Sequence, residues 1–219
     1  MKPIKVISIT LMARGAPVMI IGALTTNALH VIELKQLPTS ISKIRQTIRG
    51  VIDKLAAAGE TASVFIEDPT GLLRGVGGYQ MRLDDKSSDG RPLLAVAMER
   101  YRAMTSLKGL AYPGGGSGEE FSISSGIMNI KVGDNGRAIY EIDWESLKDG
   151  SRALLLLIYG AMCQGPLQAD FLSRMYAHLG QHGSPQERGP VDSFLALTAG
   201  LDLERSSRFP AAARHGETL

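Results

Sequence analysis

Three short hydrophobic runs occupy the first forty residues of the chain, and each is rich in β-branched side chains. Two short turn-forming segments, Arg14–Pro17 and Thr25–Asn27, separate the runs, which cover Ile4–Met12, Val18–Leu24 and Ala28–Leu37. Turns as short as these join neighbouring antiparallel strands. The pattern therefore predicts a three-stranded antiparallel meander at the start of the fold.

The hydrophobic period changes after Pro38 from that of a strand to that of a helix. Apolar side chains recur at spacings of three and four residues, at Ile41, Ile44, Ile48, Val51 and Leu55. This spacing is typical of one helix face, and Gly59 is placed to end the helix. A buried strand, Ala62–Glu67, follows. Because a strand–helix–strand step normally makes a right-handed parallel crossover, we expect this strand to lie parallel to Ile4–Met12.

The later part of the chain predicts helices joined by loops, together with one hairpin. The letters "GDNG" indicate the turn of a hairpin within Gly126–Trp144. The glycine-rich segments 71–91 and 112–120 have few apolar anchors, so we expect them to be flexible loops. Residues 1–203 are then expected to form one domain, followed by a disordered polar tail at 204–219. Helices are predicted at 92–104, 146–163, 167–179 and 191–203.

Composition narrows the class of protein. A chain of 219 residues with 44% hydrophobic residues fits one large globular domain. The formal net charge is only +2, so a contact with nucleic acid has to come from a local basic patch. The longest apolar run, Ala153–Cys163, is too short to span a bilayer. The single cysteine of the chain, Cys163, ends this run and is expected to be buried, which suits a reducing compartment. We therefore expect a cytoplasmic protein with no membrane partner.

Basic residues flank the apolar stripe of the first predicted helix. Lys43, Arg45, Arg49 and Lys54 all fall outside that stripe. They could form a solvated helix face, which is the common role of such charges. They could also form a local patch for nucleic acid, and the sequence leaves both interpretations open.

Two carboxylates stand at the end of the most hydrophobic strand. Glu67 and Asp68 follow "SVFI" directly, and a proline and a glycine then stop the strand. Acidic residues before a proline often mark a solvated turn. Asp192 lies in the first turn of the last predicted helix, where it interacts well with the helix dipole. Ala196 and Ala199 share its face, so that helix could lie close to a sheet and direct Asp192 at the strand ends.

The order of these elements resembles the ribonuclease H-like fold. The stretch "VFIEDPTG" is similar to the fourth strand of Holliday-junction resolvases and of the nuclease domain of phage large terminases, where the glutamate is a metal ligand. The stretch "PVDSFLALTAG" is similar to their final helix, which carries another ligand. The chain also resembles bacteriophage maturation control proteins. The resemblance implies an α/β fold with a ribonuclease H-like mixed sheet, a three-strand antiparallel meander plus parallel strands, flanked by helices.

The resemblance also implies a chemistry. Enzymes of this kind hold two divalent cations about 3.5–4 Å apart on clustered carboxylates and cleave a phosphodiester. It implies DNA as the partner, Mg²⁺ or Mn²⁺ as the cofactor, and Glu67 and Asp192 as catalytic residues. Glu67, Asp68 and Asp192 are the metal ligands that it implies, since these cations prefer hard oxygen ligands.

The sequence departs from this pattern in the first strand. Ser8 or Thr10 stands where the family has an acid, and a hydroxyl brings no charge. Another carboxylate would have to fill the place, or the site is degenerate. The candidates, each of which could equally be a surface residue, are Asp84, Asp85, Asp143 and Asp170.

Three functions therefore remain open. The first is a metal-dependent nuclease acting on DNA. The second is a catalytically inactive relative that binds nucleic acid, or a phage or host protein, and regulates DNA processing or packaging. The third is a structural or assembly role that uses the glycine-rich loops as contact sites. The geometry of Glu67, Asp192 and a third acid is the observation that separates them.

Overall fold

The computed structural model describes residues 3–12, 16–25, 28–87, 90–113, 123–133 and 138–163. The predicted helices at 167–179 and 191–203 lie outside the described residues, as do Asp170, Asp192 and the segment 204–219. Most of the predicted loop at 112–120 also lies outside them. The single domain expected over residues 1–203 therefore stays a prediction.

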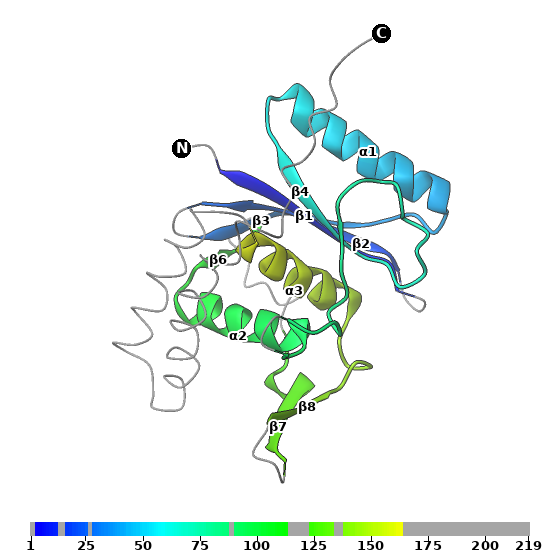
Figure 1. Cartoon of the computed structure of the whole chain (residues 1–219). Coiled ribbons are helices and arrows are strands. Elements are labelled where there is room, and N and C mark those ends of the chain that lie inside the picture. The colour runs from blue at the N-terminus through cyan, green and yellow to red at the C-terminus, as the bar shows by residue number, and fades with distance from the viewer. Residues whose placement is uncertain are drawn as a thin grey trace, which may run out of the picture. The chain divides into compact units, whose positions relative to one another are not determined.

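A mixed sheet forms the centre of the described fold (Figure 1). β1 pairs antiparallel with β2, and β2 pairs antiparallel with β3, which is the predicted meander. β4 pairs with β1 in parallel, as the crossover rule predicted. Two short strands, β5 and β6, extend the sheet beyond β4 and β3, giving the order β5-β4-β1-β2-β3-β6. The strands are β1 Ile4–Thr10, β2 Val18–Leu24, β3 Leu29–Gln36, β4 Ala62–Glu67, β5 Tyr79–Gln80 and β6 Leu110–Ala111.

The predicted fold class, an α/β fold whose mixed sheet combines a three-strand antiparallel meander with parallel strands and is flanked by helices, is confirmed. The β-β-β-α-β order of the first seventy residues follows directly from the hydrophobic periods, which change from two to 3.6 and back. β5 and β6 were not predicted, because two residues are too few to show a period.

Helices cover both faces of the sheet (Figure 1). α1, Ile41–Ala57, lies on one face, and α3, Asp149–Met162, lies on the other. α2, Leu93–Ser106, packs against α3. The predicted hairpin is present as β7, Met128–Val132, and β8, Ala138–Ile142, which pair only with each other in the described part of the chain. A short 3-10 helix, Ser125–Ile127, precedes it.

Alternation along β1 and β4 divides their side chains between the two helical layers. Ile7 and Ile9 belong to the apolar core beneath α1, with Val64 and Ile66 of β4 beside them. The intervening residues point at α3, because successive side chains of a strand face opposite sides. They include Ser8, which donates a hydrogen bond of 2.7 Å to the carbonyl oxygen of Ala153. Polar side chains of the strands are therefore carried beneath α3.

α3 lies unusually close to the sheet. A Cβ atom added to Gly160 would stand 2.4 Å from Cδ2 of Phe65, so no larger residue fits there without movement. A Cβ added to Gly22 would stand 2.9 Å from Cδ2 of Leu157. Two glycines, one on the helix and one on β2, thus permit the close approach. The helix itself was predicted from the apolar run, but its position on the sheet was not.

Two expectations need correction. Cys163 is exposed rather than buried, because α3 ends at Met162 and the cysteine lies just beyond the helix. The segment 71–91 is not poor in apolar anchors, since Leu73, Val76 and Leu83 are all buried. Its flexibility stays a prediction. Among the described helices, none has both the length and the apolar character needed to cross a membrane.

Candidate functional site

The carboxyl ends of the neighbouring strands β1 and β4 lie side by side. The two strands are parallel, and Thr10 is the register partner of Glu67. The backbone N–H of Leu11 donates to the carbonyl oxygen of Glu67 at 2.8 Å, which holds the two ends together. Side chains of register partners in a parallel pair point to the same face. Thr10 and Glu67 are therefore neighbours beneath the start of α3.

Glu67 is held by an arginine from α3. Arg152 donates from Nε to Oε2 at 2.6 Å and from Nη2 to Oε1 at 2.7 Å. The backbone N–H of Leu83 donates to Oε1 at 2.8 Å. The Glu67 side chain is 1% exposed and that of Arg152 is 9% exposed. Both carboxylate oxygens are thus bound in a buried bidentate ion pair, which is the strongest geometry for such a pair.

The surroundings of Arg152 add further contacts. Its guanidinium carbon lies 4.7 Å from the centre of the Trp144 ring, a cation–π distance. Asp149, in the first turn of α3, accepts a hydrogen bond of 3.1 Å from the backbone N–H of Ala16. Burial raises the pKa of Asp149, and the bond from Ala16 and the charge of Arg152 oppose that shift. The start of α3 is therefore tied to β4 through Arg152 and to the entry of β2 through Asp149.

The hydroxyl groups of β1 do not replace a carboxylate. Ser8 is fully buried, and its hydroxyl donates a hydrogen bond to the carbonyl oxygen of Ala153. Thr10 is 1% exposed, and within the described structure its Oγ1 has no hydrogen-bond partner. Thr10, rather than Ser8, is the residue beside Glu67. Position 10 is therefore the place in β1 at which a carboxylate would stand beside Glu67.

Asp68 shapes the turn that follows β4. One carboxylate oxygen accepts bonds from the backbone N–H and the hydroxyl of Thr70, at 3.0 and 2.5 Å. The other accepts a bond of 2.6 Å from the backbone N–H of Leu73. This is the capping role common for aspartate in turns. Asp68 thereby anchors the beginning of the loop, and Leu73 is buried as a result.

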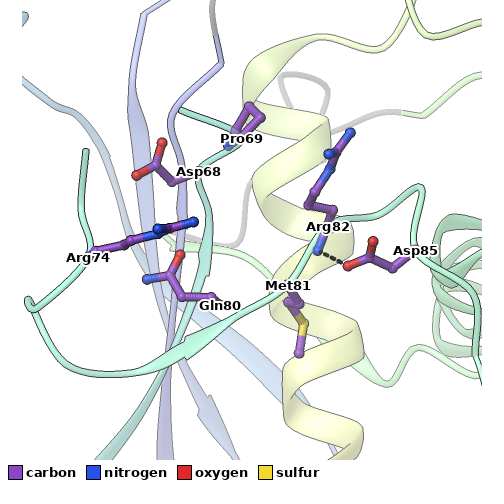
Figure 2. A pocket seen from close by; sticks show the side chains of 7 residues that line it. All are labelled: Asp68, Pro69, Arg74, Gln80, Met81, Arg82 and Asp85. Atoms are coloured by element: carbon purple, nitrogen blue, oxygen red, sulfur yellow. Dashed lines mark hydrogen bonds between the residues drawn. The ribbon is translucent and has the colours of Figure 1, made fainter. Parts of the chain in front are cut away.

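A hollow of about 300 Å³ lies beside this turn (Figure 2). Arg74 and Gln80 stand on one side of it, and Arg82 and Asp85 stand on the other (Figure 2). Arg82 is engaged with Asp84 through bonds of 2.9 and 2.6 Å. The hollow opens at the same edge of the sheet as the Glu67–Arg152 pair. It is lined by Asp68, Pro69, Arg74, Gln80, Met81, Arg82 and Asp85.

The other candidate acids do not join Glu67. Asp84 is exposed and paired with Arg82, and Asp85 accepts a bond of 2.9 Å from the backbone N–H of Arg82. Asp143 is exposed and binds Ser146, and the hydrogen bond from the Ser146 hydroxyl is the main cause of its lowered pKa. Asp170 and Asp192 lie outside the described residues. Asp192 as a catalytic and metal residue, and the triad of Glu67, Asp68 and Asp192, thus stay predictions.

The described residues at this strand end do not fit a divalent cation. Both oxygens of Glu67 are bound by Arg152 and Leu83, and both oxygens of Asp68 are bound within its own turn. A guanidinium adjacent to the site would repel a metal ion. Among the residues that the structure describes, no group of three or more histidine, cysteine or acidic side chains could hold a metal. The described residues alone therefore do not supply a ligand set for the implied Mg²⁺ or Mn²⁺.

Sequence analysis missed Arg152 and Asp149. A signal was present, because Arg152 is the one charged residue between Ser151 and Met162, in an otherwise apolar helix. Arginine is rarely buried without a partner. An arginine in this apolar helix therefore indicated that a buried carboxylate from another part of the chain pairs with it. The sequence of α3 alone does not identify that carboxylate.

No protein-family model matches the chain, and no curated protein matches it. The large terminase nuclease of the thermophilic phage G20c is similar in structure, with 14% identity and a TM-score of 0.42 over 74% of this chain and 82% of that one. The large terminase nuclease domain of Thermus phage P74-26 gives 14% identity and 0.43 over 71% and 78%.

Proposed function

We propose that this protein is a ribonuclease H-like protein that binds DNA in phage DNA processing or packaging and does not cut it. The observation that carries the proposal is the bidentate contact of Arg152 with Glu67. The guanidinium supplies the positive charge beside the strand-end glutamate that a divalent cation would supply in a nuclease. The site then keeps its electrostatic balance without a metal.

Burial makes this arrangement difficult to exchange. A cation that displaced Arg152 from Glu67 would leave the guanidinium buried and unpaired, and that costs about 3–5 kcal/mol. The metal would also have to displace the Leu83 N–H from Oε1. Two carboxylate ligands on neighbouring strands would bind a cation strongly enough to offset this loss. The residue beside Glu67 on β1 is Thr10, which has no carboxylate. The balance therefore favours the ion pair.

DNA is the partner that fits the fold type together with the basic residues of the described surface. The resemblance of "VFIEDPTG" to resolvases and terminase nucleases supports a DNA-related role. The exposed cations of α1 supply local charge in a chain whose net charge is small. Binding to phosphates needs such local charge and no metal.

The test has two parts. The protein is incubated with supercoiled and branched DNA and Mg²⁺ or Mn²⁺, with an EDTA control, and cleavage is followed on gels. Binding of the same DNA molecules is measured by fluorescence anisotropy in EDTA. We expect binding in EDTA and no cleavage with either metal.

Two results would overturn the proposal. Cleavage that depends on metal and disappears with EDTA would identify a nuclease, and Glu67, Asp68 and Asp192 would then be its first candidate ligands. Absence of DNA binding at low salt would remove the DNA-binding role. A phage or host protein would then be the partner to seek.

A further inference from the structure

The cations of α1 fall on two separate flanks of the helix. Arg45 and Arg49 are one turn apart, so they share a face, and the helical period places them beside Ile52. Lys43 and Lys54 fall on the other side of the buried residues Ile44 and Ile48. All four cations are exposed. The two flanks therefore meet different neighbours.

The flank of Arg45 faces the loop that follows β4. Nη2 of Arg45 donates a bond of 2.6 Å to the carbonyl oxygen of Leu72. The loop is anchored at the next residue, because Leu73 is buried and its N–H binds Asp68. Arg74 follows and is exposed. Arg74 thus lies two residues beyond the contact of Arg45, and its side chain lines the hollow beside Asp68 (Figure 2).

Glycine at position 71 leaves room for the side chain of Arg74. Gly71 has a φ of +70°, and a Cβ atom there would stand 3.0 Å from Nε of Arg74. The stem of Arg74 therefore lies against the turn. Arg45, Arg49 and Arg74 together are called the arginine flank from here on.

The arginine flank has no carboxylate bound to it in the described structure. Arg49 and Arg74 make no side-chain hydrogen bond or ion pair with any described residue, and the bond of Arg45 is to a carbonyl oxygen. Asp68 lies next to Arg74 in the hollow, and both of its carboxylate oxygens accept hydrogen bonds from residues of its own turn. Three guanidinium groups thus keep donors for an outside anion. Guanidinium is the side chain best suited to phosphate.

A groove of about 470 Å³ continues the same side of α1. Ile52 forms part of one wall, and Gly77 and Gly78 form part of another. Gly78 has a φ of +117°, and a Cβ there would stand 2.7 Å from the carbonyl oxygen of Val64, so only glycine fits. Glycine is therefore required at position 78 by the packing of its backbone against Val64. None of the residues that line this groove is charged, so the cations available to an anion are those of the arginine flank itself.

We propose that the arginine flank binds the phosphodiester backbone of DNA, without regard to sequence. The inference rests on the proposed DNA-binding function and names the surface that performs it. The opposite flank, Lys43 and Lys54, does not take part. Contacts with phosphate fix position and carry most of the salt dependence.

The experiment compares two variants that lose the same charge. One variant is Arg45→Gln/Arg49→Gln/Arg74→Gln. The control is Lys35→Gln/Lys43→Gln/Lys54→Gln, which removes three exposed cations elsewhere. Affinity for single-stranded and duplex DNA is measured by anisotropy over a series of salt concentrations in EDTA.

The slope of log K against log salt separates the outcomes. Each phosphate contact on duplex DNA contributes about 0.9 to the slope, so the arginine variant is expected to lose up to about 2.7 and the control close to none. If both variants bind DNA as the full protein does, or lose equal slope, the surface assignment is wrong while DNA binding stands. If the unmodified protein does not bind DNA, both proposals fail.

Folding is checked for each variant by its thermal midpoint. Because Arg45 also holds Leu72, an Arg49→Gln/Arg74→Gln variant retains that bond and is tested beside the triple variant. It is expected to lose about 1.8 of the slope. A double variant with unchanged slope would contradict the proposal even if the triple variant were destabilised.

Discussion

At the scale of single residues, the Glu67–Arg152 pair joins two elements that are far apart in the chain. Eighty-five positions separate its members. A buried pair of this kind gains little net free energy over apolar residues of the same shape, because both charges lose their water. It does set a strong preference for one arrangement, since either charge alone would be buried and unpaired. The pair therefore fixes where the start of α3 lies on the sheet.

The first prediction concerns this pair. Glu67→Leu leaves Arg152 buried without a partner and is expected to lower the free energy of unfolding by about 3–5 kcal/mol. Arg152→Met should lower it to a similar extent, because Glu67 then keeps only the Leu83 N–H. The double variant Glu67→Leu/Arg152→Met removes both charges and should recover most of the loss. Urea denaturation of all four proteins measures these differences.

One outcome would show that the Glu67–Arg152 pair contributes little to stability. If the double variant were as unstable as the sum of the two single variants, the two side chains would not be coupled. Glu67 would then act mainly through its bond to the Leu83 N–H.

The second prediction concerns pH and Asp149. Its pKa in the folded protein is raised, mainly by burial, so its contribution to stability is greatest below the pKa of the unfolded chain. That contribution is lost as the pH rises through the raised pKa. Asp149→Asn can still accept the Ala16 N–H and carries no charge. We expect this variant to be more stable than the unmodified protein at pH 7.

Melting across a pH series tests this sign. The advantage of Asp149→Asn should shrink as the pH falls and vanish below about pH 3, where the aspartate is protonated in both the folded and the unfolded state. A variant that is less stable at pH 7 would mean that the Arg152 charge and the helix dipole outweigh the burial of the carboxylate.

At the scale of elements, α3 depends on a missing side chain. Gly160 lets the helix lie against Phe65, which in turn stacks on Tyr79 with ring centres 5.2 Å apart. Glycine inside a helix normally destabilises it by roughly 0.5–1 kcal/mol relative to alanine. Here the close approach offsets that loss, because it brings Arg152 and Ala153 within reach of β4 and β1.

The third prediction follows from this contact. Gly160→Ala is expected to destabilise the protein by about 1–3 kcal/mol, since α3 or Phe65 must move. Gly50 of α1 is the matched control, because a Cβ atom there meets nothing within 4 Å. Gly50→Ala should be stabilising, by up to about 1 kcal/mol. Thermal or urea unfolding measures both, and equal effects of the same sign would show that packing at Gly160 does not matter.

Elements with a clear hydrophobic period could be predicted from the sequence, and short or edge elements could not. β1 to β4 and α1 each carry a run long enough to show a period. β5 and β6 are two residues long, and the backbone of their neighbours rather than their own side chains places them. The loop after β4 was expected to lack anchors because its glycines dominate its composition. Leu73, Val76 and Leu83 are nevertheless spaced so that each reaches the core.

At the scale of the whole molecule, the sequence predicted the topology but not the partner of Glu67. The crossover rule needs only the order of the elements, so the parallel pairing of β1 with β4 could be derived. The ion pair needs the position of α3 along the sheet, which Gly160, Gly22 and the turns before α3 determine together. No local pattern holds that information. That the first strand lacks the acid of the family stays a prediction from the resemblance, and Thr10 is the β1 residue that lies beside Glu67.

The last prediction asks whether this fold can be returned to metal binding. Thr10 and Glu67 are register partners on neighbouring parallel strands, which lie about 4.8 Å apart. The double variant Thr10→Asp/Arg152→Gln would place two carboxylates side by side and remove the competing guanidinium. Two such groups repel each other, and a divalent cation between them relieves the repulsion. Mn²⁺ at a hundred times its dissociation constant would then stabilise the variant by about 2.7 kcal/mol.

Thermal melting with and without Mn²⁺ is the measurement, and EDTA should reverse the rise in midpoint. The unmodified protein is expected to show no rise, because Arg152 already neutralises Glu67. Thr10→Asn/Arg152→Gln is the control, since it has nearly the same shape and lacks the second carboxylate. If the double variant does not fold without metal, recovery of its circular dichroism on addition of Mn²⁺ gives the same information. An equal rise in the unmodified protein and the control would mean that Mn²⁺ binds elsewhere, and Arg152 would then not be the substitute for a metal at this strand end.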